Sequence, residues 1–547
     1  RWTRATALVL LVLVAIPGLL SGCASPPQVT DVVPAKGAIG VPSREPIRIT
    51  FDRPMNRGSV NWRLKLIQLY KNGSGKELQG TSFRWLGGQR VELEHQALLP
   101  STAYQVALYP DYKDARGVPN ALRHSWVFTT EGPPFFSEAS PSDGDQQVTP
   151  STYIGLTFSR QMDLESMAQA VSISPTTRFT LERDPANPWR VLVVPDTLLE
   201  SNHLYTVAVT SKARDVDGNQ LPEGAAVSFT TGSQPGLQHW VGFVAKEPTG
   251  APAGLWIVDD KGLPRELLPM PVSNFSWSSD GRRALVQSSS GIWLDEDLQG
   301  GSEILPFHAT WAAYLAPGQG YAYLDGSNLY TLAPSGQPRL VETGVGSAAV
   351  DPSGTRIAFT SSNQVGSSVS AYDVGLRTDY RLGTETAPVD GLSWSPDGLS
   401  LAYRVLTPNP AKHQIRVRLL RDAGTTSTVA TGPVSAPVWQ ADSRHVYFTV
   451  PVRTSAGQVS RLFRATAGEP PLTSFTAASG LPNQAGFSVG AVSPSPDGRQ
   501  IAFLSGSPGH AGQVWLMNAD GTGLTLLTSF ARQAVGYQAT ALSWTPS

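Results

Sequence analysis

The 547-residue sequence has a single cysteine, so no disulfide bond can form within the chain. It also lacks an excess of charge of either sign, because 42 Lys and Arg residues offset 43 Asp and Glu residues to leave a net charge of -1. This balance excludes a global field that would attract nucleic acid or an anionic membrane surface. Long helical periodicity is hard to find beyond the N-terminus.

The abundant residues favour β structure. The 52 glycines and 44 prolines supply frequent turns, while 14 Trp, 15 Tyr and 18 Phe residues supply large core side chains. Short stretches of alternating apolar and polar residues lie between these turns, as is typical of half-buried strands. A chain of this length needs roughly three or four domains of ~150 residues each. The sequence therefore predicts an all-β protein with several domains.

The N-terminus has the layout of a secretory signal. Arg1 and Arg4 precede an apolar stretch over residues 5–20, and small residues lead from there to Cys23. A transmembrane helix or an uncleaved signal is the alternative, but the apolar run of ~16 residues is shorter than the ~20 needed to span a bilayer. We therefore expect residues 1–22 to be a signal peptide.

The segment Leu20-Ser-Gly-Cys23 resembles the lipobox of bacterial lipoproteins. The resemblance implies that the Cys23 thiol carries a diacylglyceride and becomes the mature N-terminus, with residues 23–28 as a lipidated linker. Several acyl chains would anchor the protein stably in a membrane. The expected location is extracytoplasmic, on the outer membrane of a host with two membranes and on the cell surface otherwise.

An internal repeat follows the linker. In the first copy Pro34 lies 21 residues before Met55, and in the second Pro141 lies 21 residues before Met162. Each copy continues with a Tyr-x-Val strand, an Asp-x-x-Gly turn and a final Phe-Thr-Thr strand. Alternation such as Ile-Arg-Ile-Thr-Phe over 47–51 buries one face of a strand, and ~100 residues suit a seven-stranded sandwich.

These motifs resemble the bacterial Ig-like domain of the SbsA type. The resemblance implies two β-sandwiches, over 29–131 and 132–232, that act as spacers or adhesive modules. Met55 and Met162 are expected to fill the cores of these sandwiches.

The second copy of the turn raises the question of a metal site. Asp215, Asp217 and Asn219 alternate along the chain, and alternating oxygen ligands suit calcium. The twelve-residue calcium loop is not completed, however, and Asp-Gly and Gly-Asn are strong turn formers. We favour a structural turn and keep these three residues as weak metal candidates.

A different repeat occupies residues 239–547. A motif of the Trp-Ser-x-Asp-Gly type, degenerate in several copies, opens each repeat. The copies recur about every 35–55 residues, which is the spacing of four-stranded propeller blades. Its clearest copies begin at Trp277, Trp394 and Pro494. The region resembles the TolB-like, WD40-like β-propeller family.

The blade count predicts how the ring closes. Six opening motifs lie between 277 and 497, and a seventh, around Trp544, ends the chain with no strand after it. Conversely, residues 241–268 contain outer strands with no opening motif before them. The sequence therefore predicts seven blades, in which the C-terminal strand completes the N-terminal blade. Predicted long rim loops, at 361–370, 405–413, 452–460 and 474–488, are candidate binding loops.

No complete catalytic constellation is present. A Gly-x-Ser-x-Gly stretch occurs at residues 486–490, but the Pro- and Gly-containing segment after it shows no helical pattern, which a nucleophile elbow requires. The eight histidines show no pair at metal-ligand spacing. The repeated Asp residues of the turns have a structural role first, and no cofactor is expected. We favour a non-catalytic envelope lipoprotein that presents its propeller to a protein or glycan partner, or that serves as a structural component of an envelope assembly. The alternative is a glycan-active lyase or glycosidase with paired carboxylates in the propeller channel.

Overall fold

The structure is a computed structural model that describes residues 25–363, 366–420, 424–455, 457–476, 478–481, 487–506, 512–528 and 537–546. The predicted signal peptide and Cys23 lie outside the described residues. Within the described ranges, no helix is both long enough and apolar enough to cross a membrane. Strands dominate the secondary structure, which confirms the predicted all-β class.

The chain divides into two compact units. The first comprises residues up to Phe136 together with 158–170 and 209–225, and the second comprises 137–157, 171–208 and 226–547. The first unit therefore holds the first sandwich and two segments of the second, while the second unit holds the remaining strands of the second sandwich and the propeller.

The first sandwich is built from two four-stranded sheets. Its elements are β1 (Val29–Val33), β2 (Ile47–Phe51), α1 (Arg57–Arg63), β3 (Leu64–Leu69), β4 (Gly75–Glu77), β5 (Ser82–Leu86), β6 (Arg90–Glu94), β7 (Ala103–Leu108), β8 (Tyr112–Lys113), β9 (Pro119–Asn120) and β10 (His124–Thr129). One sheet has the order β1-β2-β6-β5 and the other β10-β7-β3-β4. The alternate residues Ile47, Ile49 and Phe51 of β2 are buried, as the alternation in the sequence predicts.

The second sandwich repeats this plan. Its elements are β11 (Phe136–Ser140), β12 (Ile154–Phe158), α2 (Leu164–Ala170), β13 (Val171–Ser174), β14 (Phe179–Arg183), β15 (Arg190–Pro195), β16 (Leu204–Val209) and β17 (Ala225–Thr230). The sheets have the orders β11-β12-β15-β14 and β13-β16-β17. Met55 and Met162 are both buried, as expected of core side chains.

Seven sheets follow in the propeller region. The first sheet consists of β18 (Val241–Lys246), β19 (Pro252–Val258), β20 (Arg265–Leu268) and β44 (Gln538–Trp544). The next three are β21–β24 (Val272–Trp277, Arg283–Ser288, Ile292–Asp297, Ser302–His308), β25–β28 (Trp311–Tyr314, Tyr321–Asp325, Asn328–Leu332, Arg339–Glu342) and β29–β32 (Val345–Val350, Arg356–Asn363, Gly366–Asp373, Thr378–Glu385). The last three are β33–β36 (Val389–Trp394, Ser400–Val405, Gln414–Leu419, Thr426–Thr431), β37–β39 (Val438–Trp439, His445–Thr454, Gly457–Thr466) and β40–β43 (Val489–Pro494, Gln500–Ser505, Gln513–Asn518, Thr525–Leu526).

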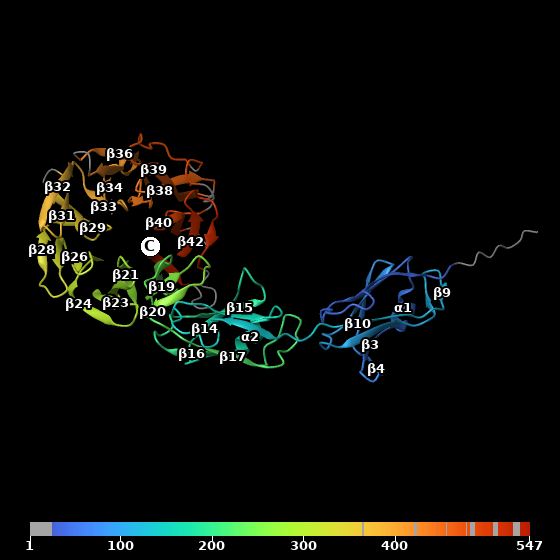
Figure 1. Ribbon diagram of the computed structural model, residues 1–547. Coiled ribbons are helices and arrows are strands. Elements are labelled where there is room, and N and C mark those ends of the chain that lie inside the picture. Colours follow the sequence, from blue (N-terminus) through green and yellow to red (C-terminus); the bar gives the residue numbers. More distant parts are fainter. Residues whose placement is uncertain are drawn as a thin grey trace, which may run out of the picture. The chain divides into compact units, whose positions relative to one another are not determined.

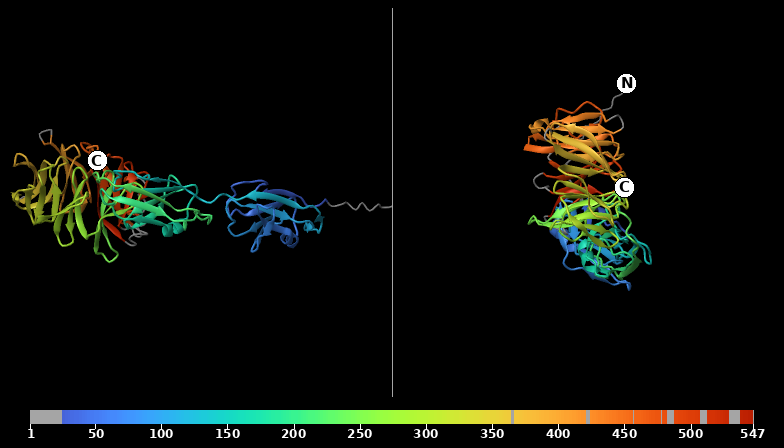
Figure 2. Two further views of the ribbon diagram at one scale, coloured as in Figure 1. Left: turned by 60° about the horizontal axis from the view of Figure 1, so that its bottom comes forward. Right: turned by 90° about the vertical axis from the view of Figure 1, so that its left-hand side faces the viewer.

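The seven sheets form the blades of a ring. In Figure 1, β21, β29, β33 and β40 lie around the centre of the ring, whereas β24, β28 and β32 lie at its rim. The right-hand view of Figure 2 is turned by 90° and shows the ring from its edge.

The C-terminal strand closes the ring. Strand β44 pairs antiparallel with β18, with Val241 opposite Trp544 and Lys246 opposite Gln538. Because β44 is the innermost strand of the first blade and β18 is the next one out, the two ends of the propeller share one sheet. The seven-bladed ring predicted from the sequence is therefore present.

The Asp-Gly turns join the innermost strand of a blade to the next strand. Gly398 and Gly498 have φ values of +66° and +72°, a left-handed conformation that glycine adopts at little cost. In each of these turns a Ser hydroxyl donates to the Asp carboxylate two residues later, from Ser395 to Asp397 and from Ser495 to Asp497 at 2.6 Å. The repeated Asp residues thus stabilise turns, as the repeat indicates.

Two of the predicted rim loops are wrong. Residues 361–370 lie mostly in the long hairpin of β30 and β31, and 452–460 in that of β38 and β39, where Val452 pairs with Val459. The backbone groups of these Ser- and Gly-rich segments pair between the two strands of each hairpin, so the segments lengthen the blades and do not form loops. Residues 405–413 begin at the last residue of β34 and contain the short 3₁₀ turn Pro410–Lys412. Residues 474–488 lie partly outside the described residues.

Candidate functional site

One candidate site is a cavity at the centre of the ring. It has a volume of about 840 Å³ and is lined by the ends of the innermost strands and by the turns that follow them. A pocket of a few hundred cubic ångströms suits a small ligand or a segment of a larger one. Its lining residues are indoles, prolines, small apolar residues and hydroxyl groups, exemplified by Trp394, Pro396, Ala441, Ser493 and Ser543.

The tryptophans of this cavity also hold the blades together. The indole N–H of Trp394 donates to Ala349 O at 3.0 Å, that of Trp439 to Ser393 O at 2.9 Å and that of Trp544 to Ser493 O at 2.8 Å. In each case the acceptor belongs to the innermost strand of the preceding blade. These three indoles are buried, so their rings fill the space between sheets and only their edges reach the cavity.

The tryptophans of the second and third blades are more accessible. Trp277 and Trp311 are only partly buried, and both also line an adjoining cavity of about 420 Å³. Trp277 rests over Gly242, where a Cβ atom would come within 2.4 Å of the indole. The Nε1 atom of Trp277 is buried without a hydrogen-bond partner among the described residues. This side of the channel therefore offers aromatic surface.

The cavity lining contains no ionisable side chain among the described residues. Neither Asp, Glu, His, Lys nor Arg contributes to the 840 Å³ cavity. The turn carboxylates lie beside it but are engaged: the Ser495 hydroxyl holds the pKa of Asp497 below its usual value. The cavity can thus donate and accept hydrogen bonds and cover apolar surface, but it lacks a group that could exchange a proton near neutral pH.

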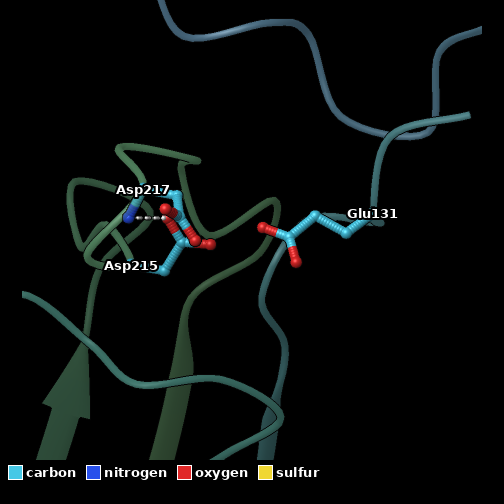
Figure 3. A group of neighbouring side chains, drawn as sticks. All are labelled: Glu131, Asp215 and Asp217. Atoms are coloured by element: carbon cyan, nitrogen blue, oxygen red, sulfur yellow. Dashed lines mark hydrogen bonds between the residues drawn. The ribbon is translucent and has the colours of Figure 1, made fainter. Parts of the chain in front are cut away.

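The weak metal candidates of the sequence lie in the first unit, near an acidic residue that the sequence analysis does not identify. Carboxylate oxygens of Asp215, Asp217 and Glu131 lie within 4.8 Å of one another. Figure 3 shows Asp215 and Asp217 in one turn and Glu131 on a separate segment, with its carboxylate directed towards Asp215. Glu131 was missed because no local pattern marks it.

The hydrogen bonds of this group are those of a structural turn. The Asp215 carboxylate accepts from the backbone N–H groups of Asp217 at 3.1 Å and Asn219 at 2.7 Å. Asn219 points its amide nitrogen at Asp215 and Glu131, so it acts as a donor and not as the oxygen ligand that a calcium site would need. Arg160 forms an ion pair with Glu131. The carboxylates of Asp215 and Glu131 therefore already have donors.

A buried arginine in the second unit was also missed. The guanidinium of Arg265, in β20, is fully buried 4.2 Å from the ring centroid of Tyr153 and donates to Thr152 O at 2.9 Å. Burial lowers the pKa of Arg265 and raises the pKa of the nearby carboxyl of Asp259. This arrangement attaches the second sandwich to the first blade.

Comparison with known proteins agrees with the sandwich repeat. The family described as the bacterial Ig-like domain matches residues 24–130 and again residues 131–231. The two sandwiches are therefore bacterial Ig-like domains. No curated protein matches the chain.

Several solved structures are similar to the chain. A putative TolB from Agrobacterium tumefaciens is 17% identical over 53% of this chain and 88% of that chain, with a TM-score of 0.33. TolB from Acinetobacter baumannii is 13% identical over 69% and 83%, with a TM-score of 0.35. Hydrazine synthase from Kuenenia stuttgartiensis is 14% identical over 45% and 76%, with a TM-score of 0.34.

Proposed function

We propose that the protein is a non-catalytic, extracytoplasmic lipoprotein that uses its propeller to bind a protein or glycan partner, with the central channel as the binding site. The observation that carries this proposal is the chemistry of the 840 Å³ cavity, whose lining combines indole and proline surface with hydroxyl groups and contains no ionisable side chain among the described residues. Such a lining suits recognition, because apolar surface supplies affinity and a few polar groups supply orientation.

The same observation weakens the enzymatic alternative. Glycosidases use a pair of carboxyl groups that flank the scissile bond, and one of them must donate a proton. The described lining of the 840 Å³ cavity supplies neither member of such a pair, and Asp351, the carboxylate that lines the adjoining cavity, is already paired with Arg356 at 3.0 Å. The acidic residues of the Asp-Gly turns are held by Ser hydroxyl groups and form part of the turns, so they are poor substitutes.

A charge placed at the cavity tests the binding site. Ser279 is exposed and lines the cavity, so Ser279→Arg should fill its mouth without disturbing the core. Ser290→Arg is the matched control, because Ser290 is equally exposed but does not line the cavity. Full-length protein is used to capture partners from envelope membranes of its host. We expect one stoichiometric protein or polysaccharide with the wild type and the control, and its loss with Ser279→Arg. Equal capture by both variants would show that the channel is not the binding site.

The lipid anchor is tested independently at Cys23. Two acyl chains bury enough CH₂ groups for stable membrane attachment, at ~0.8 kcal/mol per group. Cys23→Ala should therefore release the protein from membranes into the soluble fraction. Unchanged sedimentation with the membranes would refute lipidation, whether or not the channel binds a partner.

A further inference from the structure

The first sandwich exposes an aromatic side chain that its fold does not need. Trp62, in the last turn of α1, is 77% exposed, whereas Val60 on the same helix is buried in the core. Large aromatic side chains gain most from burial, so an isolated tryptophan this exposed is unusual on a monomer surface.

A small pocket lies beside this tryptophan. It has a volume of about 440 Å³ and is formed by the end of α1, the start of β3 and the segment after β7, including Tyr109 and Asp111. The two sides are held together by a hydrogen bond from Tyr109 N to Arg63 O of 3.0 Å. Asp111 has a φ of +66°, a conformation that costs a non-glycine residue energy and is enriched at functional sites.

Cationic side chains surround the two aromatic rings. The Lys65 ammonium lies 5.7 Å from the centroid of Trp62, and the Arg123 guanidinium lies 4.8 Å from that of Tyr109. The Arg63 guanidinium lies 3.8 Å from the Asp111 carboxylate. The pocket therefore combines an exposed indole face with several charged donors and one carboxylate acceptor.

The second sandwich shows that the fold does not require these side chains. Its helix α2 ends in the same way, and the hydrogen bond from Thr210 N to Ala170 O, at 2.9 Å, matches the one from Tyr109 N to Arg63 O. At the exposed position that corresponds to Trp62 the second sandwich has Gln169. In the second sandwich, Thr210 stands at the position of Tyr109 and Ser172 at that of Lys65. Lys212 stands at the position of Asp111 and Gly224 at that of Arg123. The backbone is thus preserved while the aromatic pocket is absent.

We infer that the Trp62 pocket is a binding site for a pyranose ring of an envelope glycan that carries N-acetyl and carboxylate groups, such as peptidoglycan. The apolar face of a pyranose ring can stack on the exposed indole, while Asp111 accepts from hydroxyl or amide N–H groups. The carboxylates of the glycan complement Arg63 and Arg123, whereas the Lys65 ammonium already pairs with Glu77 at 2.9 Å. A protein partner would need a larger apolar centre, since charged residues lie immediately beside Trp62. The inference rests on the extracytoplasmic location given in the proposed function. It does not depend on binding of a partner in the propeller channel.

Sedimentation with purified peptidoglycan sacculi tests this inference in the full-length protein. We expect the wild type to sediment with sacculi and to be displaced by a soluble peptidoglycan fragment that carries both N-acetyl and carboxylate groups. Trp62→Ala should weaken this binding at least about tenfold, since a tryptophan at the centre of a binding site commonly contributes that much, and Trp62→Phe should retain part of it. Trp189→Ala is the matched control, because Trp189 is 55% exposed on the second sandwich.

The outcomes separate this site from the channel. Unchanged thermal unfolding of Trp62→Ala shows that any loss of binding arises at the pocket and not from misfolding. Partner capture by the propeller should be unaffected by this substitution. The inference is overturned if the wild type does not bind sacculi, or if Trp62→Ala and Trp189→Ala bind them equally well.

Discussion

Replacing Trp544 by alanine should destabilise the whole propeller, although only three residues follow it in the sequence. Trp544 is 7% exposed and packs in a cluster with Val241 and Phe243 of β18 and with Leu516 of the last blade. Truncating a buried tryptophan costs about 3–5 kcal/mol, and losing its hydrogen bond to Ser493 O at 2.8 Å adds about 1 kcal/mol. A loss of about 5 kcal/mol is a large part of the stability of a typical domain.

Scanning calorimetry of the full-length protein measures this effect. The largest transition belongs to the propeller, because the enthalpy of unfolding grows with the number of residues. For a domain of roughly 300 residues we expect its midpoint to fall by about 8 °C. Trp62→Ala is the control, since substitution of a side chain that is 77% exposed should change stability by no more than about 0.5 kcal/mol. The same small shift in both variants would refute the claim that the C-terminal strand supports the ring.

Three further predictions concern charged groups. The Arg48 guanidinium, 2.7 Å from Glu92, holds the pKa of that carboxyl below its usual value, so the folded state binds this proton less tightly than the unfolded state. The first sandwich should therefore lose stability as the pH falls below about 4.5, the usual Glu value, towards the lowered pKa, and thermal melts should show a weaker pH dependence in Glu92→Gln. Burial raises the pKa of the Asp259 carboxyl, so the folded state binds this proton more tightly than the unfolded state, and the free energy of unfolding falls as the pH rises towards the raised pKa. Asp259→Asn should therefore raise the melting temperature of the propeller at about pH 7 but not at about pH 4. An unchanged melting temperature at the higher pH would contradict this. Because Arg160 already pairs with Glu131, about 1 mM calcium should leave the melting temperature unchanged, and a calcium-dependent rise would instead identify a metal site.

Local signals predict the architecture well. The Asp-Gly turns and the alternation of apolar residues mark each strand from its own sequence, and the unpaired motif around Trp544 predicts its partner near Val241. Ring closure pairs two segments that are far apart in the sequence, but counting the opening motifs predicts it. Residues 241–268 have outer strands without an opening motif, and the motif around Trp544 has no strand after it. The long hairpins were missed, because Ser- and Gly-rich segments such as 366–373 resemble loops until their partner strand is known.

The candidate sites are less predictable. Helix α1 has seven residues, too few to show helical periodicity, so the exposure of Trp62 could not be foreseen. A tryptophan in a sequence is usually assigned to the core, and only the fold places it at the surface. Glu131 likewise joins Asp215 through folding of the chain, with no spacing pattern that connects them. The uncharged lining of the channel also emerges only when the innermost strands meet.

A cross-strand disulfide tests the closed ring most directly. Lys246 and Gln538 are exposed and lie directly opposite each other in β18 and β44, at a separation that suits a disulfide. In a Cys23→Ser background, Lys246→Cys with Gln538→Cys should form this bond nearly completely under mild oxidation and raise the melting temperature of the propeller. Lys246→Cys with Gln458→Cys, which lies in another blade, should keep both thiols free. Free thiols in the first pair, in a protein that remains folded, would contradict the closed propeller on which the proposed binding site depends.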